Sequence, residues 1–365
     1  MKILVIQQKM IGDVLTSSIL FEALRKKYPD AELHYLIYTH TFPVVEHNPF
    51  IDRILLFDPV VDLKPNGLLP LLKKIKKEKY DLVIDVYAKI NTAIISAFSG
   101  ATKRISYYKK YTSGAYTHTF ELLTSPKTSA GLAIENRMLL LTAVAKDFPA
   151  ELKPKLYLTK EEISSAKALM KNAGIEVDKP VYMIGILGSS SEKTYPLKYM
   201  AEILNKIISS VPAAQLLFNY IPSQEKEAKE LYNLCSPQTQ QHIFFETYGR
   251  SLREFMAITA QCDALIGNEG GAVNMAKALN VPTFSIFSPQ IKKENWSIYE
   301  NEADHVSVHL KDYHPEFLTA LSRKTLTKKA AQFYEQLKPN LILAKLNTFL
   351  QTNSSGKIAE LKQIQ

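Results

Sequence analysis

The sequence predicts an α/β fold built from two doubly wound parallel-sheet domains. Short apolar segments alternate with segments of helical periodicity, which is the order of elements in βαβ folds. The clearest strands are continuous apolar runs, as expected when helices cover both faces of a parallel sheet. This alternation stops in a polar stretch near the middle of the chain and then begins again. Because 365 residues suffice for two ordinary cores, we expect one domain on each side of that stretch.

In the first half, the helix at residues 14–27 has the clearest pattern. Leu15, Ile19 and Ala23 recur at every fourth position along it, as on one face of a helix. The expected strands of this half are residues 2–6, 32–38, 53–57, 80–87 and 103–106.

The domain junction falls within residues 151–180, where the chain is polar and charged. Thr159 and Glu162 have the spacing of a capping box that opens a helix. Beyond it we expect strands at 181–187, 214–220, 242–245, 264–267 and 283–287, and helices at 196–210, 225–234, 252–261 and 272–279. The expected domains are 1–160 and 161–330, followed by a helical tail over 331–365.

Composition narrows the class of protein. No run of eighteen uncharged apolar residues is present, and the chain starts directly with a strand, so we expect a cytoplasmic protein. Cys235 and Cys262 have neither the number nor the spacing of a disulfide framework or a zinc site. The eight histidines likewise show no metal-ligand spacing.

The chain has a net charge of +9, and part of the positive charge is clustered in the sequence. Five lysines lie within residues 71–81, at the end of an expected helix. They form either a solvated helix face or a patch for an anionic membrane surface. Tyrosines and cations also interleave in residues 103–120, which suits a sugar-acceptor surface or single-stranded nucleic acid. We favour the acceptor surface and expect no nucleic-acid partner.

Three loops at the expected carboxyl ends of strands carry the candidate chemistry, because ligands bind there in open α/β sheets. The first is QQKMIGDVLTS, which lacks the glycine spacing of a dinucleotide site or a P-loop. It places Asp13 in the first turn of a helix. Asp13 is either a carboxylate that interacts with the helix dipole or a general base.

The second loop follows Gly188 and contains three serines, Lys193 and a proline suited to start a helix. Hydroxyls, free amides and an ammonium group would suit a phosphate, although a polar flexible loop has the same composition. The third loop, Asn268-Glu269-Gly270-Gly271, opens a helix at Ala272. Its glycines would give an anion access to helix-terminal amides, or simply form a turn.

Together these loops resemble glycosyltransferase family 9, the lipopolysaccharide heptosyltransferases. The resemblance covers roughly residues 1–290 and rests on Gly12-Asp13, on Lys193 before Tyr-Pro, and on Glu269-x-Gly271-x-x-Asn274. It implies a GT-B fold, in which two Rossmann-like domains face each other across a cleft. The acceptor would bind the N-terminal domain and the nucleotide sugar the C-terminal one, with the tail crossing back to the first domain.

Carried over by position, the resemblance makes Asp13 the catalytic base. Ser189 and Lys193 would contact the donor diphosphate. In the family's Asp-[Ser/Thr]-Gly-x-x-His motif only the glycine is kept, as Gly271. Glu269 replaces the aspartate, Gly270 the hydroxyl residue and Asn274 the histidine.

The resemblance thus implies an inverting, metal-independent glycosyltransferase. The donor would be ADP-heptose or a related nucleotide sugar, and the acceptor lipopolysaccharide core or another glycolipid. No cofactor is expected, the chain is expected to be a monomer, and the basic segment would contact the inner leaflet. Two alternatives stay open: a silent nucleotide-sugar-binding protein, motivated by the changed motif, and a UDP-sugar epimerase.

Overall fold

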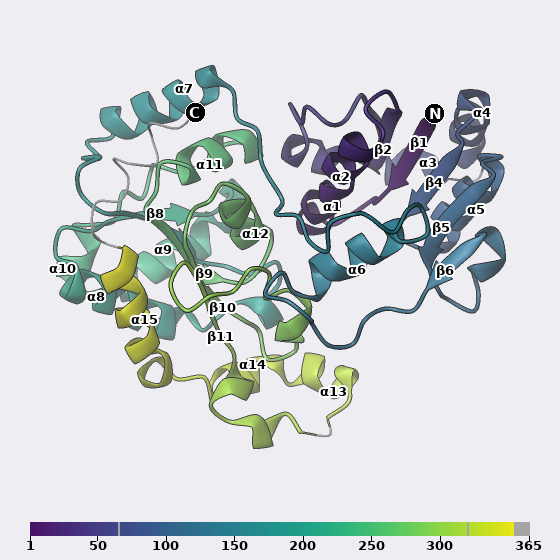
Figure 1. Cartoon of the computed structure of the whole chain (residues 1–365). Helices are drawn as coiled ribbons and strands as arrows, with labels where there is room; N and C mark the ends of the chain where they lie inside the picture. The colour runs from purple at the N-terminus through teal and green to yellow at the C-terminus, as the bar shows by residue number, and fades with distance from the viewer. Residues whose placement is uncertain (65, 320, 354–365) are drawn as a thin grey trace. The chain divides into compact units, whose positions relative to one another are not determined.

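The computed structural model describes residues 1–64, 66–319 and 321–353. Contacts divide the chain into two compact units (Figure 1). Unit 1 comprises Met1–Tyr157 together with Glu294–Ile298, and unit 2 comprises Leu158–Lys293 and the chain from Tyr299 onward. The division after Tyr157 lies inside the polar stretch in which the sequence analysis placed the junction.

Unit 1 contains a six-stranded parallel sheet in the order β3-β2-β1-β4-β5-β6. In its centre, Val5 of β1 is paired with Tyr35 on one side and Ile84 on the other. All five predicted strands are present. The sixth was missed because it is only three residues long and has no apolar run. The strands are β1 (Lys2–Ile6), β2 (Glu32–Tyr38), β3 (Arg53–Phe57), β4 (Leu82–Asp85), β5 (Lys103–Tyr107) and β6 (His118–Phe120).

The predicted helix at 14–27 is two helices, α1 and α2, separated at Ser18. The Ser18 hydroxyl donates to the carbonyl of Leu15 at 2.7 Å, a local bond that competes with the regular helical pattern. The helices of unit 1 are α1 (Ile11–Ser17), α2 (Ile19–Lys27), α3 (Pro59–Asp62), α4 (Leu68–Glu78), α5 (Ile90–Phe98) and α6 (Leu132–Leu141), with 3-10 turns η1 (Thr39–Val44) and η2 (Ser113–Ala115).

Unit 2 contains a five-stranded parallel sheet in the order β11-β10-β9-β7-β8. The prediction of a strand at 242–245 is wrong, because Ile243 forms only an isolated bridge to Leu216. β11 was missed, since its sequence HVSV alternates instead of forming an apolar run. The strands are β7 (Val181–Gly185), β8 (Gln215–Asn219), β9 (Ala264–Asn268), β10 (Thr283–Ile286) and β11 (His305–Val308).

The predicted capping box opens the first helix of unit 2: the Thr159 hydroxyl accepts from the N–H of Glu162, whose carboxylate accepts from the N–H of Thr159. The helices are α7 (Lys160–Asn172), α8 (Leu197–Ser210), α9 (Glu225–Leu234), α10 (Pro237–Gln240), α11 (Leu252–Thr259), α12 (Gly271–Ala278), α13 (Arg323–Lys328), α14 (Ala330–Tyr334) and α15 (Pro339–Asn353). The 3-10 turns are η3 (Ser191–Lys193), η4 (Pro222–Gln224), η5 (Lys293–Asn295, part of it in unit 1), η6 (Leu310–Asp312) and η7 (Pro315–Phe317).

The described part of the C-terminal tail packs in the core of unit 2. Ile342, Leu346 and Phe349 of α15 are fully buried in the core of unit 2. The Phe349 ring lies 5.7 Å from that of Phe284 in β10. The apolar face of α15 is therefore satisfied within unit 2, and residues 354–365 of the predicted tail lie outside the described residues.

None of the helices in the described ranges is both long enough and apolar enough to span a membrane.

Candidate functional site

In unit 1, the strand order reverses between β1 and β4. The sheet continues through β2 and β3 on one side and through β5 and β6 on the other. Such a reversal opens a crevice for ligands at the carboxyl ends of the two central strands. The loop after β1 is joined there to the start of α5, the helix after β4, because Asn91 Nδ2 donates to Gln8 Oε1 at 2.7 Å. This edge is the candidate site of unit 1.

Asp13 lies at this edge, in the first turn of α1, with 29% of its side chain exposed. Its Oδ2 accepts a hydrogen bond from the backbone N–H of Met10 at 3.2 Å, which is the expected interaction of a helix-capping carboxylate. Its Oδ1 accepts another from Arg137 Nη2 at 3.0 Å. A capping carboxylate does not need this second, charged partner. The pair therefore favours a role for Asp13 beyond the helix start.

Arg137 comes from α6, and its guanidinium group is held on three sides. Nε donates to Ser17 Oγ at 2.7 Å, and Nη1 donates to the Ala133 carbonyl at 2.6 Å. Only 7% of the side chain is exposed. A buried guanidinium requires a compensating negative charge, which Asp13 supplies. The orientation of the Asp13 carboxylate is thus fixed by a side chain that is itself fixed.

A second carboxyl, that of Asp85, ends β4 and is buried. Burial raises its pKa, although the hydroxyl of Tyr116 donates to Oδ2 at 2.7 Å and the N–H groups of Tyr87 and Ala88 donate to Oδ1. These bonds hold the β4–α5 loop in place. Asp85 is fully enclosed, so we assign it a structural role, whereas Asp13 is accessible.

In unit 2, the loop after β7 is held against the end of β9 by Asn268. Its Oδ1 accepts from the N–H of Tyr195 at 2.7 Å, and its Nδ2 donates to the carbonyls of Gly185 and Ile186 at 3.0 Å. Gly188 lets the loop fold back on itself, since a Cβ there would lie 2.2 Å from the Lys193 carbonyl oxygen. Lys193 is therefore positioned beside β9.

Glu269, the residue after β9, carries a largely enclosed carboxyl group. Its Oε1 is buried and has no hydrogen-bond partner among the described residues. Burial raises the pKa of this carboxyl, and the positive charge of Lys193 partly counteracts the effect. An unsatisfied buried polar atom costs free energy. The group is thus suited to a ligand that supplies the missing partner.

The start of α12 completes this edge of unit 2. Gly270 precedes the helix with φ of +151°, and the position of a Cβ there is open, with no described atom within 4 Å. The first amides of α12 are unpaired within the helix and favour an anion. Asn274 is buried one turn further on, and Ser189 is exposed in the loop after β7. The predicted donor-site residues thus lie in the loop after β7, in the loop after β9 and in the first turn of α12, all in unit 2, whereas Asp13 lies in unit 1.

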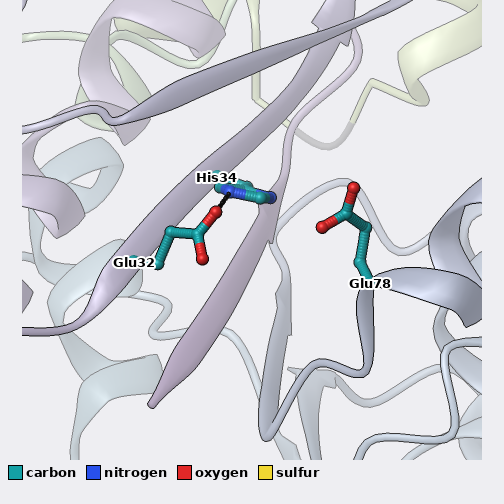
Figure 2. Close-up of side chains that lie close together, drawn as sticks. All are labelled: Glu32, His34 and Glu78. Atoms are coloured by element: carbon teal, nitrogen blue, oxygen red, sulfur yellow. Dashed lines mark hydrogen bonds and ion pairs between the residues drawn. The ribbon is translucent and has the colours of Figure 1, made fainter.

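One cluster in the described residues has the composition of a metal site. The ligand atoms of Glu32, His34 and Glu78 lie within 4.8 Å of one another (Figure 2). However, Lys2 Nζ lies 3.1 Å from Glu32 Oε2 and 2.8 Å from Glu78 Oε2. This ammonium group lowers the pKa of both carboxyls. We interpret the cluster as a network of ion pairs at the amino ends of β1 and β2, opposite the candidate site.

Arg137 and Asn268 were not predicted as site residues from the sequence. Arg137 lies 124 residues from Asp13 within a largely apolar helix, so no local pattern connects the two. Asn268 ends an apolar strand beside Glu269, and a buried amide at that position could have been suspected from the pattern.

Comparison with known proteins identifies the family of the chain. Residues 68–322 match the model of glycosyltransferase family 9 (heptosyltransferase). The chain is 25% identical over 294 residues to lipopolysaccharide heptosyltransferase 1 of Campylobacter coli, covering 79% of this chain and 84% of that protein.

Solved structures extend the agreement to the fold. A family 9 glycosyltransferase of Veillonella parvula has a TM-score of 0.72 at 17% identity, over 92% of this chain and 97% of that one. The ADP-heptose lipopolysaccharide heptosyltransferase II of E. coli has a TM-score of 0.66 at 16% identity, over 92% and 99%. The predicted GT-B fold class is confirmed. The chain belongs to glycosyltransferase family 9 and is a glycosyltransferase.

Proposed function

We propose that this glycosyltransferase moves heptose or a related sugar from a nucleoside-diphosphate sugar to a lipopolysaccharide core or related glycolipid. ADP-heptose is the first donor to test, because the similar E. coli protein is described as an ADP-heptose lipopolysaccharide heptosyltransferase. The Campylobacter coli relative supports an acceptor of the lipopolysaccharide class.

The observation that carries the proposal is the accessible Asp13 carboxylate, oriented by Arg137 at the carboxyl edge of unit 1. Asp13 accepts the proton of the acceptor hydroxyl as the hydroxyl oxygen attacks the anomeric carbon. The bond from that carbon to the diphosphate oxygen breaks on the opposite side, and its electron pair leaves with the nucleoside diphosphate. The configuration at the anomeric carbon is therefore inverted.

Charge on the departing diphosphate is stabilised by groups of unit 2. Lys193 supplies an ammonium group, Ser189 supplies a hydroxyl, and the amides at Gly270 and Gly271 lie at the positive end of α12. These groups take over the role that a metal ion has in other transferases. We propose that the reaction requires no added metal.

The changed motif bears on the identity of the donor sugar, which is the first property to measure. Glu269 is one methylene longer than aspartate, and Gly270 has no hydroxyl. Asn274 forms hydrogen bonds but does not titrate in the physiological range. These changes alter the shape of the donor pocket while keeping an acid and a hydrogen-bonding side chain in it. A donor related to ADP-heptose but different in its sugar fits this pattern.

The test is calorimetric binding of nucleoside diphosphates and nucleotide sugars, with and without EDTA. We expect selective, metal-independent binding by the wild type and weaker binding by Lys193→Ala. A donor identified in this way is then incubated with lipopolysaccharide acceptors, and the anomeric configuration of the product is determined by NMR.

Product analysis separates the remaining alternatives. Binding without turnover would support the silent nucleotide-sugar-binding protein, for which the changed Glu269, Gly270 and Asn274 provide the motive. An isomerised donor would indicate an epimerase. The presence of Asp13, paired here with Arg137, and of Lys193 favours transfer.

A further inference from the structure

The helix α5 of unit 1 has an unusual exposed face. Its sequence, INTAIISAF, contains no charged residue. Ile90, Ile94 and Phe98 recur at four-residue spacing and are 63%, 38% and 53% exposed. The opposite side, including Ile95, is buried in the core beneath the helix. Large apolar side chains aligned on one exposed face of a helix are typical of an interaction surface.

The neighbouring helix, α4, supplies a cationic border to this face. α4 contacts α5, and both helices cover the same side of the unit 1 sheet (Figure 1). Lys73, Lys74, Lys76 and Lys77 of α4 are exposed, whereas its Leu71, Leu72 and Ile75 are buried in the shared core.

From this combination we infer that α4 and α5 form a docking surface for an anionic lipid bilayer. The apolar face of α5 would enter the boundary between headgroups and acyl chains, while the lysines of α4 remain at the headgroup phosphates. A second copy of the chain fits this surface less well, since two lysine-rich helices would be brought together without a counter-charge.

The position of α5 connects this surface to the candidate site and rests on the proposed function. α5 begins at the carboxyl edge of the sheet, where Asn91 in its first turn is bonded to Gln8 after β1. The Ile90 end of the apolar face therefore lies at the edge that also carries Asp13. A sugar acceptor anchored in the same bilayer would be presented to that edge.

The test is co-sedimentation of the full-length protein with vesicles. Phosphatidylcholine vesicles that contain phosphatidylglycerol are compared with vesicles of phosphatidylcholine alone. We expect the wild type to bind the anionic vesicles and to dissociate at high salt. Lys73→Gln combined with Lys77→Gln should weaken binding roughly 30-fold, at about 1 kcal/mol per lysine. Phe98→Glu should weaken it roughly 10-fold or more.

Matched controls lie in unit 2. Lys167 and Lys171 of α7 have the same spacing as Lys73 and Lys77 and are also exposed, so their double change to glutamine tests the effect of charge alone. Val177 is 54% exposed, so Val177→Glu tests the effect of removing an exposed apolar side chain. Both controls should bind vesicles like the wild type.

Three results would overturn the inference. The first is no vesicle binding by the wild type. The second is vesicle binding that the two control variants reduce as much as the α4 and α5 variants do. The third is a dimer in analytical ultracentrifugation that Phe98→Glu dissociates, which would make the surface an interface between copies. Calorimetric binding of the nucleotide donor is measured on the same variants. Absence of donor binding by the wild type would count against the proposed function. The vesicle results bear on the docking surface alone.

Discussion

Asp13 in unit 1 and Glu269 in unit 2 both follow a buried strand at the carboxyl edge of a parallel sheet, yet their surroundings differ. Asp13 receives one hydrogen bond on each carboxylate oxygen, from Met10 and Arg137. Glu269 has a buried oxygen with no partner among the described residues, and burial raises its pKa. Unit 1 therefore holds a preorganised carboxylate, whereas unit 2 holds a carboxyl group that a ligand would complete. We assign the chemical step to the first and donor recognition to the second.

The strongest test of this contrast is Asp13→Asn. Removal of the proposed base should lower kcat by about 10²- to 10⁴-fold, because general base catalysis typically contributes that much. Nucleotide binding, assigned to unit 2, should stay unchanged in calorimetry. The control is Asp58→Asn, at the N-terminus of α3, where the carboxylate accepts from the N–H of Val60. Full activity of Asp13→Asn would exclude Asp13 as the base.

The next effect concerns Arg137 as a positioning residue. Arg137→Lys keeps a positive charge but cannot make three separate bonds to Asp13, Ser17 and Ala133. We expect kcat to fall about 10- to 100-fold, as for loss of a charged hydrogen bond, with KM for the donor little changed.

Arg25→Lys is the matched control, since Arg25 pairs with Asp52 at 2.6 Å on the surface. Thermal unfolding of both variants is measured in parallel. A loss of activity that merely follows the loss of stability would assign Arg137 a structural role only.

A smaller effect is expected in unit 2. Lys193→Ala should weaken nucleotide binding about 10-fold. The melting temperature should change little, because the Lys193 charge only partly counteracts the burial of the Glu269 carboxyl. Lys198→Ala removes a lysine five positions away that pairs with Glu335 on the surface, and its binding should match the wild type. Equal nucleotide affinities of the wild type, Lys193→Ala and Lys198→Ala would show that Lys193 does not contribute to the donor site.

The smallest effect is the pH dependence of stability at Glu269. A carboxyl whose pKa is raised by folding binds protons more tightly in the folded state, so the free energy of unfolding falls as pH rises above the ordinary value of 4.5. Glu269→Gln removes this loss. Without ligand, we expect it to be more stable than the wild type at neutral pH, by less than about 2 kcal/mol, with a smaller gap near pH 4.5.

Denaturant titrations across this pH range measure the gap, and the exposed Glu202→Gln serves as the control. A gap that stays constant with pH would show that the Glu269 carboxyl does not titrate differently in the folded state.

Much of the fold followed from local pattern. Continuous apolar runs such as β1 and β9 must be covered on both faces, and the sequence alone therefore located them. The pattern failed where tertiary pairing decides: residues 242–245 are apolar yet only bridge β8, and the alternating β11 is a strand because it pairs with β10.

The candidate site was predictable in unequal parts. Lys193, Glu269 and Gly270 lie in loops whose composition already suggested an anion. Arg137 could not be found in this way, because its role depends on folding α6 against α1. The exposed face of α5 could not be predicted from the sequence either, since an uncharged helical segment normally predicts burial.

Residues Glu294–Ile298 belong to unit 1, although they follow β10 of unit 2 in the sequence. Ile298 is buried, and the Ser297 carbonyl approaches Gly131, where a Cβ would lie only 2.9 Å from it. During synthesis, the first unit therefore remains incomplete until nearly three hundred residues have been translated. A gene fragment that ends at residue 157 would lack these five residues of unit 1.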